Sequence, residues 1–570
     1  MKINNEKGIA LVFTLFSVVI LLALQGIFVL NVIHEARMSS IERQQAKTFY
    51  AAQGGTQAAI EQLNVLMNTY LQNTIINSNP SGVISYAQSK VTAGDGIGWL
   101  VFSTRNNNVA VLTQNGEEAN YSANGSLGGI NYSYNIIFSQ KSAPLTIGAN
   151  AWDFPYSYRI ETTGTSGSIS NKVVLSGDFT VRVQHDNFAK FALFSNTQKM
   201  PNGTNVWFTD KTNFSGPVFT NDRFNFAFNP SGTFQEAISQ YQPTARFYNN
   251  GSSVLLNANA NGTIDVPNFQ NGFTRNAAKI TNTTTTEQSM ISEVKGNNNY
   301  TIDGIYLPTQ GSTLSGGIYV LDQANKGTSV TMSVNQNKAV YTVNLGSTTK
   351  TITVDPVLNQ TTVQIGNNTP TTYAGKPNGT DGAGTIIYVN GKISNFSGTV
   401  QQNTELTVAS HSDIIISNNV RYTNYTPASG TPGQAGYVPP SGFDANGAPY
   451  TNLLGLVSWN GNVRVGTSTP NNVEIHGTVM ASNGIFTVDN YNTRSPQGTA
   501  TLLGGAISNN YGAFGTFNGS TGAMLSGYGR NFVYDSRMQQ GHAPPYFPSL
   551  NTFIAFTNDI TDKIVWQEGE

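Results

Sequence analysis

Histidines and carboxylates are the residues of this 570-residue chain that could do chemistry. The five histidines are far apart and none has metal-ligand spacing such as H-x-x-x-H: His34, His185, His411, His476 and His542. His476, in the stretch Val-Glu-Ile-His-Gly, is predicted to be an outward or corner residue of a strand rather than a ligand. Cysteine is absent, so disulfides, thiolate metal sites and cysteine nucleophiles are excluded. We therefore predict no metal site and no cofactor.

Paired carboxylates would support glycoside hydrolysis, which β-solenoids with acidic clusters often perform. Glu474 and Asp489 fall in neighbouring short strands, and Asp413 is a third candidate. Such catalysis needs two carboxyl groups about 5 to 9 Å apart in a groove, and with 31 acidic residues in the chain chance accounts for a nearby pair. No G-x-S-x-G or phosphate-loop motif is present. We expect no enzyme; the alternative is a membrane-tethered β-solenoid carbohydrate-active enzyme.

The composition indicates a large β protein. Only 11% of residues are charged and the formal net charge is -1, which gives no electrostatic reason to expect sequence-independent binding to nucleic acid. Tyr (25), Phe (30) and abundant Gly (57) are typical of strands joined by turns. The length predicts two or three domains.

The N-terminal stretch is the element on which the rest is built. Residues 9–30 are nearly all apolar, and no charged side chain lies between Lys7 and His34. At about 1.5 Å per residue this run can cross a hydrocarbon layer roughly 30 Å thick. Apolar positions then recur with helical spacing, so we predict one helix over 9–75 whose membrane part is 9–33. A secretory signal would have a shorter apolar run and a small-residue cleavage site; an uncleaved anchor fits the length.

Two motifs in this stretch resemble the N-terminus of type IV pilins and pseudopilins. Asn5-Glu6-Lys7-Gly8-Ile9 is a polar leader ending in glycine, and the resemblance implies a prepilin-peptidase cut between Gly8 and Ile9 that removes residues 1–8. Phe13 stands where major pilins carry glutamate, which resembles the minor pilins of the PilX and GspK type. The segment 48–59 is similar to the F-x-A-A-E-A-G motif of PilX-like domains, through Phe49, Ala51, Ala52 and Gly54.

This resemblance implies a location and a set of partners. The protein would be a single-pass inner-membrane protein with its body outside the cytoplasm, in the periplasm or at the cell surface when in a pilus. Lys2 and Lys7 on the leader side agree with the positive-inside rule. Its partners would be the prepilin peptidase and, through the helix, other pilins or pseudopilins. Its role would be that of a minor subunit that enters or primes a type IV pilus or related pseudopilus. A plain membrane-anchored surface protein is the alternative.

A small antiparallel sheet of pilin type is predicted over 83–190, packed on the exposed half of the helix. Alternating apolar and polar residues indicate its strands. The predicted strands are 98–102, 109–112, 132–138, 156–161, 172–175 and 179–183.

The region 191–550 is predicted to be a β-rich body. Very short strands with Asn and Gly corners recur at steps of about 20 residues, as in Ile386 to Leu406 and Ile393 to Ile414. This favours a β-solenoid over a multi-sheet sandwich. A short helix is predicted within 272–300, a long loop at 422–450 and a C-terminal tail at 551–570. The clearest strands are 385–389, 405–409, 414–416, 453–457, 463–465, 473–475, 479–481 and 485–488.

The predicted fold class is thus α+β, mainly β: a long N-terminal pilin helix, a small antiparallel sheet and a large solenoid-like body. Short stretches of the body, such as FALFSN and VEIHGTVMAS, resemble an uncharacterised bacterial domain that follows PilX-like helices. The body also resembles, more loosely, the ComZ-like competence pilins of DNA-uptake pili, which implies binding of DNA. A surface glycan is an equally open partner, because exposed Tyr, Phe and Asn suit sugar stacking and hydrogen bonding.

Overall fold

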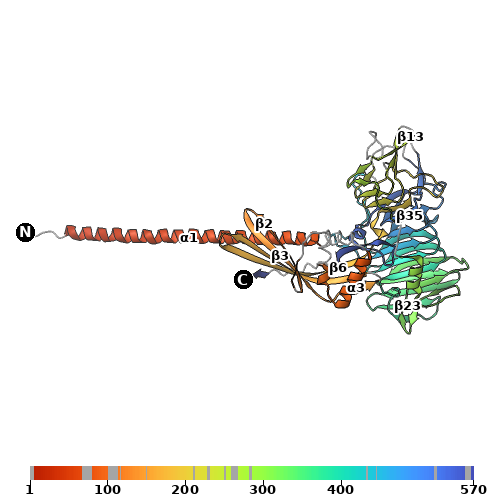
Figure 1. The fold of residues 1–570 in the computed structure, drawn as a ribbon, viewed down its shortest axis with the longest axis horizontal. Coiled ribbons are helices and arrows are strands. Elements are labelled where there is room, and N and C mark those ends of the chain that lie inside the picture. Colours follow the sequence, from red (N-terminus) through yellow and green to blue (C-terminus); the bar gives the residue numbers. More distant parts are fainter. Residues whose placement is uncertain are drawn as a thin grey trace, which may run out of the picture. The chain divides into compact units, whose positions relative to one another are not determined.

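The computed structural model describes residues 6–66, 80–100, 113–115, 117–148, 151–209, 212–227, 232–249, 252–257, 267–280, 285–431, 434–444, 446–518, 523–558 and 567–569. The chain divides into two compact units. The first contains Met1–Leu145, Trp152–Val183 and Ala555–Glu570, and the second contains Thr146–Ala151 and Gln184–Ile554. The structure is mainly β with one long N-terminal helix, as the sequence predicts (Figure 1).

The first unit joins a long helix to an antiparallel sheet. Helix α1 (Glu6–Val65) confirms the predicted helix up to Val65, and residues 67–75 of the prediction lie outside the described residues. A second helix, α3, covers Pro80–Ala93. The sheet has the order β1-β2-β3-β5-β6-β39, with β4 beside β5 and β40 beside β6. Its strands are β1 (Thr113–Asn115), β2 (Glu118–Leu127), β3 (Ile130–Gln140), β4 (Leu145–Gly148), β5 (Ala151–Ser166), β6 (Ile169–Asn187), β39 (Ser549–Asn558) and β40 (Gln567–Gly569).

Three sequence expectations for this unit change. The predicted strand 98–102 is wrong in its described part, because residues 97–100 are helical; a short buried apolar run does not distinguish strand from helix. Trp99 there is buried and stacks on Phe154 at 5.2 Å. The predicted strand 109–112 lies outside the described residues. Strands 172–175 and 179–183 are one strand, β6, and part of the expected tail forms β39 and β40.

The second unit is built on an eleven-stranded sheet whose strands stack in parallel, apart from β16, which is antiparallel to β19. The order along the sheet is β15-β11-β8-β7-β35-β32-β29-β27-β25-β19-β16. The strands are β7 (Leu193–Thr197), β8 (Val218–Thr220), β11 (Ile238–Gln240), β15 (Phe273–Thr274), β16 (Gly304–Tyr306), β19 (Ile318–Leu321), β25 (Thr385–Asn390), β27 (Glu405–Ser410), β29 (Leu453–Ser458), β32 (Thr478–Ala481) and β35 (Ala506–Asn510).

One column of side chains runs in register through ten of these strands and is buried along its whole length. Each member stacks on an equivalent position of the next strand, so apolar surface is buried between successive strands rather than within one. The column is Ile318, Ile387, Val408, Leu456, Val479, Ala506, Leu193, Val218, Ile238 and Phe273.

The order of this column differs from the order of the chain. The chain starts in the middle of the sheet at β7 and advances through β8 and β11 to β15. It then returns past helix α5 (Glu287–Lys295) to the opposite end at β19, and advances strand by strand until β35 pairs with β7. Both runs advance in the same direction along the sheet. They therefore form a single stack, although the chain enters it and leaves it near the middle.

A fourteen-stranded mixed sheet accompanies this stack. Strands β20, β26, β28, β31, β34 and β38 pair in parallel, whereas β20 to β24 form an antiparallel meander that the sequence analysis did not predict. The strands are β17 (Thr309–Gln310), β18 (Thr313–Leu314), β20 (Thr328–Asn335), β21 (Lys338–Leu345), β22 (Thr348–Asp355), β23 (Gln360–Ile365), β24 (Thr371–Ala374), β26 (Ile393–Val400), β28 (Ile414–Tyr422), β30 (Val463–Val465), β31 (Glu474–His476), β33 (Phe486–Val488), β34 (Thr499–Leu503) and β38 (Gly529–Val533).

Shorter elements complete the unit, and they include the helix predicted within 272–300, which is α5. The predicted step from Ile393 to Ile414 is confirmed as a register pair. The step from Ile386 is off by one, since Ile386 pairs with Thr407. The remaining elements are β9 (Asn225–Phe226), β10 (Thr233–Phe234), β12 (Ala245–Asn249), β13 (Ser252–Leu256), β14 (Asn268–Phe269), β36 (Gly515–Phe517), β37 (Met524–Gly527), η2 (Phe188–Lys190) and η3 (Ser536–Gln540).

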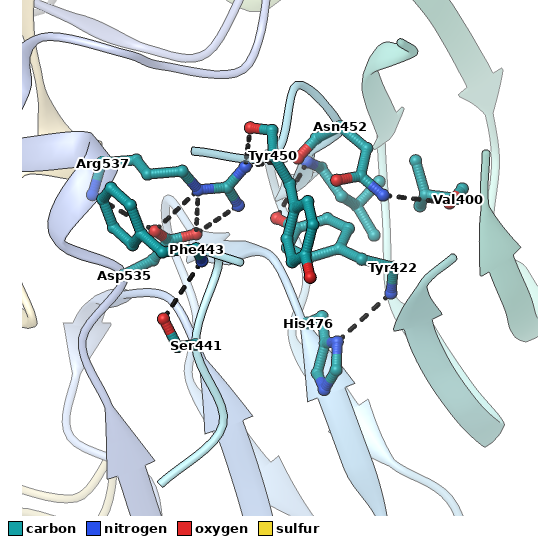
Figure 2. A network of polar contacts seen from close by, with 10 residues as sticks. Val400, Tyr422, Ser441, Phe443, Tyr450, Asn452, His476, Asp535 and Arg537 are labelled. Carbon is teal, nitrogen blue, oxygen red and sulfur yellow. Dashed lines mark hydrogen bonds and ion pairs between the residues drawn. The ribbon is translucent and has the colours of Figure 1, made fainter. Parts of the chain in front are cut away.

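A buried ion pair holds the C-terminal part of this unit against the loop between β28 and β29 (Figure 2). Asp535 and Arg537 are each 1% exposed and their side chains meet at 2.6 Å. The Arg537 guanidinium also donates to the backbone oxygens of Tyr450 (2.6 Å) and Asn452 (2.9 Å). Removing one member of a buried pair leaves an uncompensated charge, which costs about 3–5 kcal/mol. The pair therefore fixes the end of the loop predicted at 422–450.

His476 lies beside this network and is completely buried, so the prediction that it is an outward or corner residue is wrong. Its Nδ1 accepts a hydrogen bond from the backbone N–H of Tyr422 at 3.2 Å, which places the ring proton on Nε2 (Figure 2). Burial, assisted by the positive charges of Arg421 and Arg537, lowers the pKa of His476 to about 3. The imidazole is therefore neutral in the folded protein at ordinary pH.

This burial predicts a pH dependence of stability. Histidine in an unfolded chain has a pKa near 6.5. Below that pH the unfolded chain binds a proton at His476, whereas the folded protein does not. The free energy of unfolding therefore falls as the pH decreases towards 3. We expect His476→Gln to remove this contribution, about 2 kcal/mol between pH 7 and pH 5. Calorimetric unfolding of wild type and variant at both pH values measures the difference.

His185, whose pKa is also lowered by burial, contributes equally to wild type and variant and cancels in that comparison. An identical loss of stability in the two proteins would contradict the assignment.

Candidate functional site: the N-terminal helix

Helix α1 has two halves with different surroundings. Every described side chain from residue 8 to residue 47 is exposed, including large apolar ones throughout the first part. This half is long and apolar enough to cross a membrane. From Thr48 onward every third or fourth side chain is buried against the sheet, and Figure 1 shows β2 and β3 beside this part of α1.

The predicted site residues fall on both halves. Gly8, Ile9 and Phe13 are on the exposed half, where Ile9 is 58% and Phe13 is 68% exposed. No side chain of the described residues covers them. The structure does not bring them into contact with the rest of the predicted set.

The second motif lies where the helix meets the sheet. Ala51 and Ala52 are fully buried there, Gly54 is half-buried against Leu127, and Phe49 is half-buried with an edge contact to Tyr50. The motif therefore has a demonstrable role inside the first unit, where small residues let the helix approach its own sheet.

Several residues of this contact are missing from the predicted set. Thr56 Oγ1 donates to Thr162 Oγ1 on β5 (3.1 Å), and Asn171 Nδ2 donates to Gln45 O (2.9 Å) and Thr48 Oγ1 (2.7 Å). The helical spacing of small residues at 48, 52, 56 and 59 is the signal that could have found the helix side. No comparable signal marks Thr162 and Asn171 on the strands.

Gly164 of β5 sets how closely helix and sheet approach. A Cβ at this position would lie 2.1 Å from the Thr48 carbonyl oxygen and 2.9 Å from the Ala52 nitrogen, both backbone atoms that cannot rotate away. Gly55 faces the sheet in the same way, with Tyr132 and Thr162 at less than 3 Å from a built Cβ. We call this contact, formed by Thr48, Ala52, Gly55, Thr56 and Gly164, the helix–sheet seam.

One charged group flanks the seam. Glu161, next to Thr162 on β5, pairs with Lys172 at 2.9 Å and with Arg159. The hydrogen bond from Lys172 is the main cause that lowers the pKa of Glu161. The pair lies at the protein surface, so its contribution to stability is small.

The three candidate carboxylates of the body fall into two groups by their ion pairs. Glu474 Oε2 accepts from Arg421 at 2.7 Å, whereas Asp489 and Asp413 both pair with Arg464, at 3.2 and 3.3 Å. Glu474 is the first residue of strand β31, and Asp489 directly follows strand β33. These two strands do not pair with each other. Within the described residues, no group of three or more His, Asp or Glu side chains could hold a metal ion.

Residues 153–240 match a family described as a domain of unknown function, DUF4900. No curated protein matches the chain. A solved structure described as the competence-associated pilin ComZ from Thermus thermophilus is similar at 11% identity over 92% of this chain and 98% of that chain, with a TM-score of 0.26. The DUF4900 match spans β5, β6 and the first strands of the parallel stack.

The close approach at the helix–sheet seam predicts that one added methyl group at Gly164 destabilises this contact. Gly164→Ala should force the helix away from β5 and destabilise this contact by about 1–3 kcal/mol, as overpacking does. Hydrogen–deuterium exchange of the detergent-solubilised chain measures it: amides of 48–59 should exchange on the order of tenfold to a hundredfold faster.

Gly82→Ala is the matched control, since a Cβ at Gly82 meets no atom within 4 Å and alanine favours the helix α3 that contains it. Unchanged exchange over 48–59 in Gly164→Ala would contradict the close approach.

Proposed function

We propose that this chain is a pilin-like minor subunit of the PilX type, held in the inner membrane by α1 and assembled into, or priming, a type IV pilus or related pseudopilus. Its β body would face away from the cytoplasm and bind DNA or a surface glycan. The peptidase would cut between Gly8 and Ile9, and the helix would then be extracted for packing against other pilins.

One observation supports this proposal above the rest: α1 is a single helix fixed to a sheet along its second half and uncovered along its apolar first half. An apolar helix satisfies its backbone hydrogen bonds within itself, so it is stable in lipid before assembly. The same surface can contact other helices after extraction, because packing between apolar helices needs no polar groups.

The body is, in this proposal, a β-solenoid that displays surface rather than a catalyst. The in-register column from Ile318 to Phe273 supports the solenoid description, since repeats that contact only their neighbours are the defining property of such folds. The separate ion pairs of Glu474 and Asp489 agree with a non-enzymatic body.

The test is the identity of the mature N-terminus. The full chain is expressed with and without an active prepilin peptidase, and the N-terminal peptide is identified by mass spectrometry. We expect a chain that begins at Ile9 only when the peptidase is present. An intact leader beside active peptidase would exclude the pilin-like role.

Two substitutions make this test specific to the junction. Gly8→Phe should block the cut, and Gly26→Phe is the matched control, because both positions are helical glycines at which a Cβ meets no atom within 4 Å. Equal processing of the two variants would show that cleavage, if seen, occurs elsewhere.

A further inference from the structure

A cleft of about 280 Å³ opens in the second unit between strands β21 and β22 of the meander and the residues at or just before the starts of β25, β27 and β29. Its deeper wall comes from buried Tyr341, Val354 and Thr385. Its rim carries Lys376, Asn403 and Glu405, which are half-buried or exposed. Its volume is just below the range of small-molecule sites, which starts at about 300 Å³.

Tyr341 is the feature that points to a ligand. The residue is 2% exposed and its hydroxyl has no hydrogen-bond partner within the described part of the chain. The neighbouring Thr385 hydroxyl donates instead to Asn378 Oδ1 at 3.0 Å. Burial raises the pKa of Tyr341, and the side chain of Thr385 offsets this only in part. A buried hydroxyl without a partner is unfavourable unless something else supplies one.

Other hydrogen-bond donors around the cleft are also unused. The Asn378 and Asn403 side-chain oxygens accept from Thr385 and Thr451, the latter at 2.6 Å, so their amide nitrogens are left to donate. The Lys376 ammonium has no ion-pair or hydrogen-bond partner among the described residues. These donors therefore favour a ligand rich in acceptor oxygens that carries a negative charge.

We propose that this cleft binds one acidic sugar residue of a polysaccharide, with its carboxylate towards Lys376 and its ring oxygens towards Tyr341, Asn378 and Asn403. The small apolar wall of Val354 and Pro356 suits the C–H face of a pyranose ring. This inference rests on the binding role proposed for the body, and it selects a glycan over DNA. Only one cation lines the cleft, whereas nucleic acid binding depends on neutralising many phosphates.

The experiment uses the detergent-solubilised full chain and four probes: methyl glucuronide, methyl galacturonide and the corresponding neutral glucoside and galactoside. Saturation-transfer NMR and titration measure binding. We expect at least one acidic sugar to bind about tenfold more tightly than its neutral counterpart. Lys376→Met should abolish that preference, and Lys392→Met, a lysine of the same unit away from the cleft, should keep it.

Tyr341→Phe separates binding from folding. It deletes only the unpartnered hydroxyl, so the thermal unfolding temperature should stay the same or rise, while acidic-sugar binding weakens about fivefold. Three outcomes would each overturn the proposal: no binding of any probe, acidic-sugar binding by both Tyr341→Phe and Lys376→Met that is unchanged from wild type, or binding only of a single-stranded oligonucleotide. A chain that is still cut at Gly8 but binds no sugar would overturn this inference and leave the pilin-like role standing.

Discussion

The second unit depends on the parallel pairing of β35 with β7. Ala506, Ile507 and Ser508 stand opposite Leu193, Phe194 and Ser195, although more than 300 residues separate them in the chain. This pairing joins the two runs of the stack and makes its buried column continuous. It also brings the start and the end of the unit together, since the Phe188 N–H donates to the Pro548 oxygen at 3.2 Å. A large body can therefore be inserted between β6 and β39 without separating them.

The same pairing has a consequence for folding. Each strand of such a stack buries its apolar residues only against its neighbours, so an unpaired edge is a liability. The run that begins at β7 leaves that edge open until β35, the last strand of the other run, is in place. Contacts between residues this distant in sequence form slowly because loop closure precedes any gain from the contact. The buried pair of Asp535 and Arg537 follows β38 in the chain and holds this segment against the residues before β29.

Individual strands of the body are predictable from the sequence because each is a short apolar run between Asn and Gly corners, as at 463–465, where prediction and structure coincide. The order of the strands in the sheet is not predictable in this way. Packing determines which strands pair in parallel, and no local sequence feature indicates that β35 pairs with β7. His476 was placed wrongly because a polar residue type gives no sign that a backbone N–H will satisfy its ring. The helix face of the seam follows from helical spacing, whereas Gly164 is identifiable only once β5 is known to face α1.

The two halves of α1 differ in the size of their side chains and in what they contact. In the seam, Ala52, Gly55 and Gly164 are small, so backbones come close and the contact is complete without any further molecule. In the exposed half the side chains are large. Lipid chains are as apolar as leucine, so moving this surface from lipid to an apolar protein partner would change its free energy little in either direction. In the pilin-like role that we propose, the subunit would move between a membrane and a filament, and such a near balance would favour that movement. Phe13 is apolar and 68% exposed, so it adds no charge to this surface.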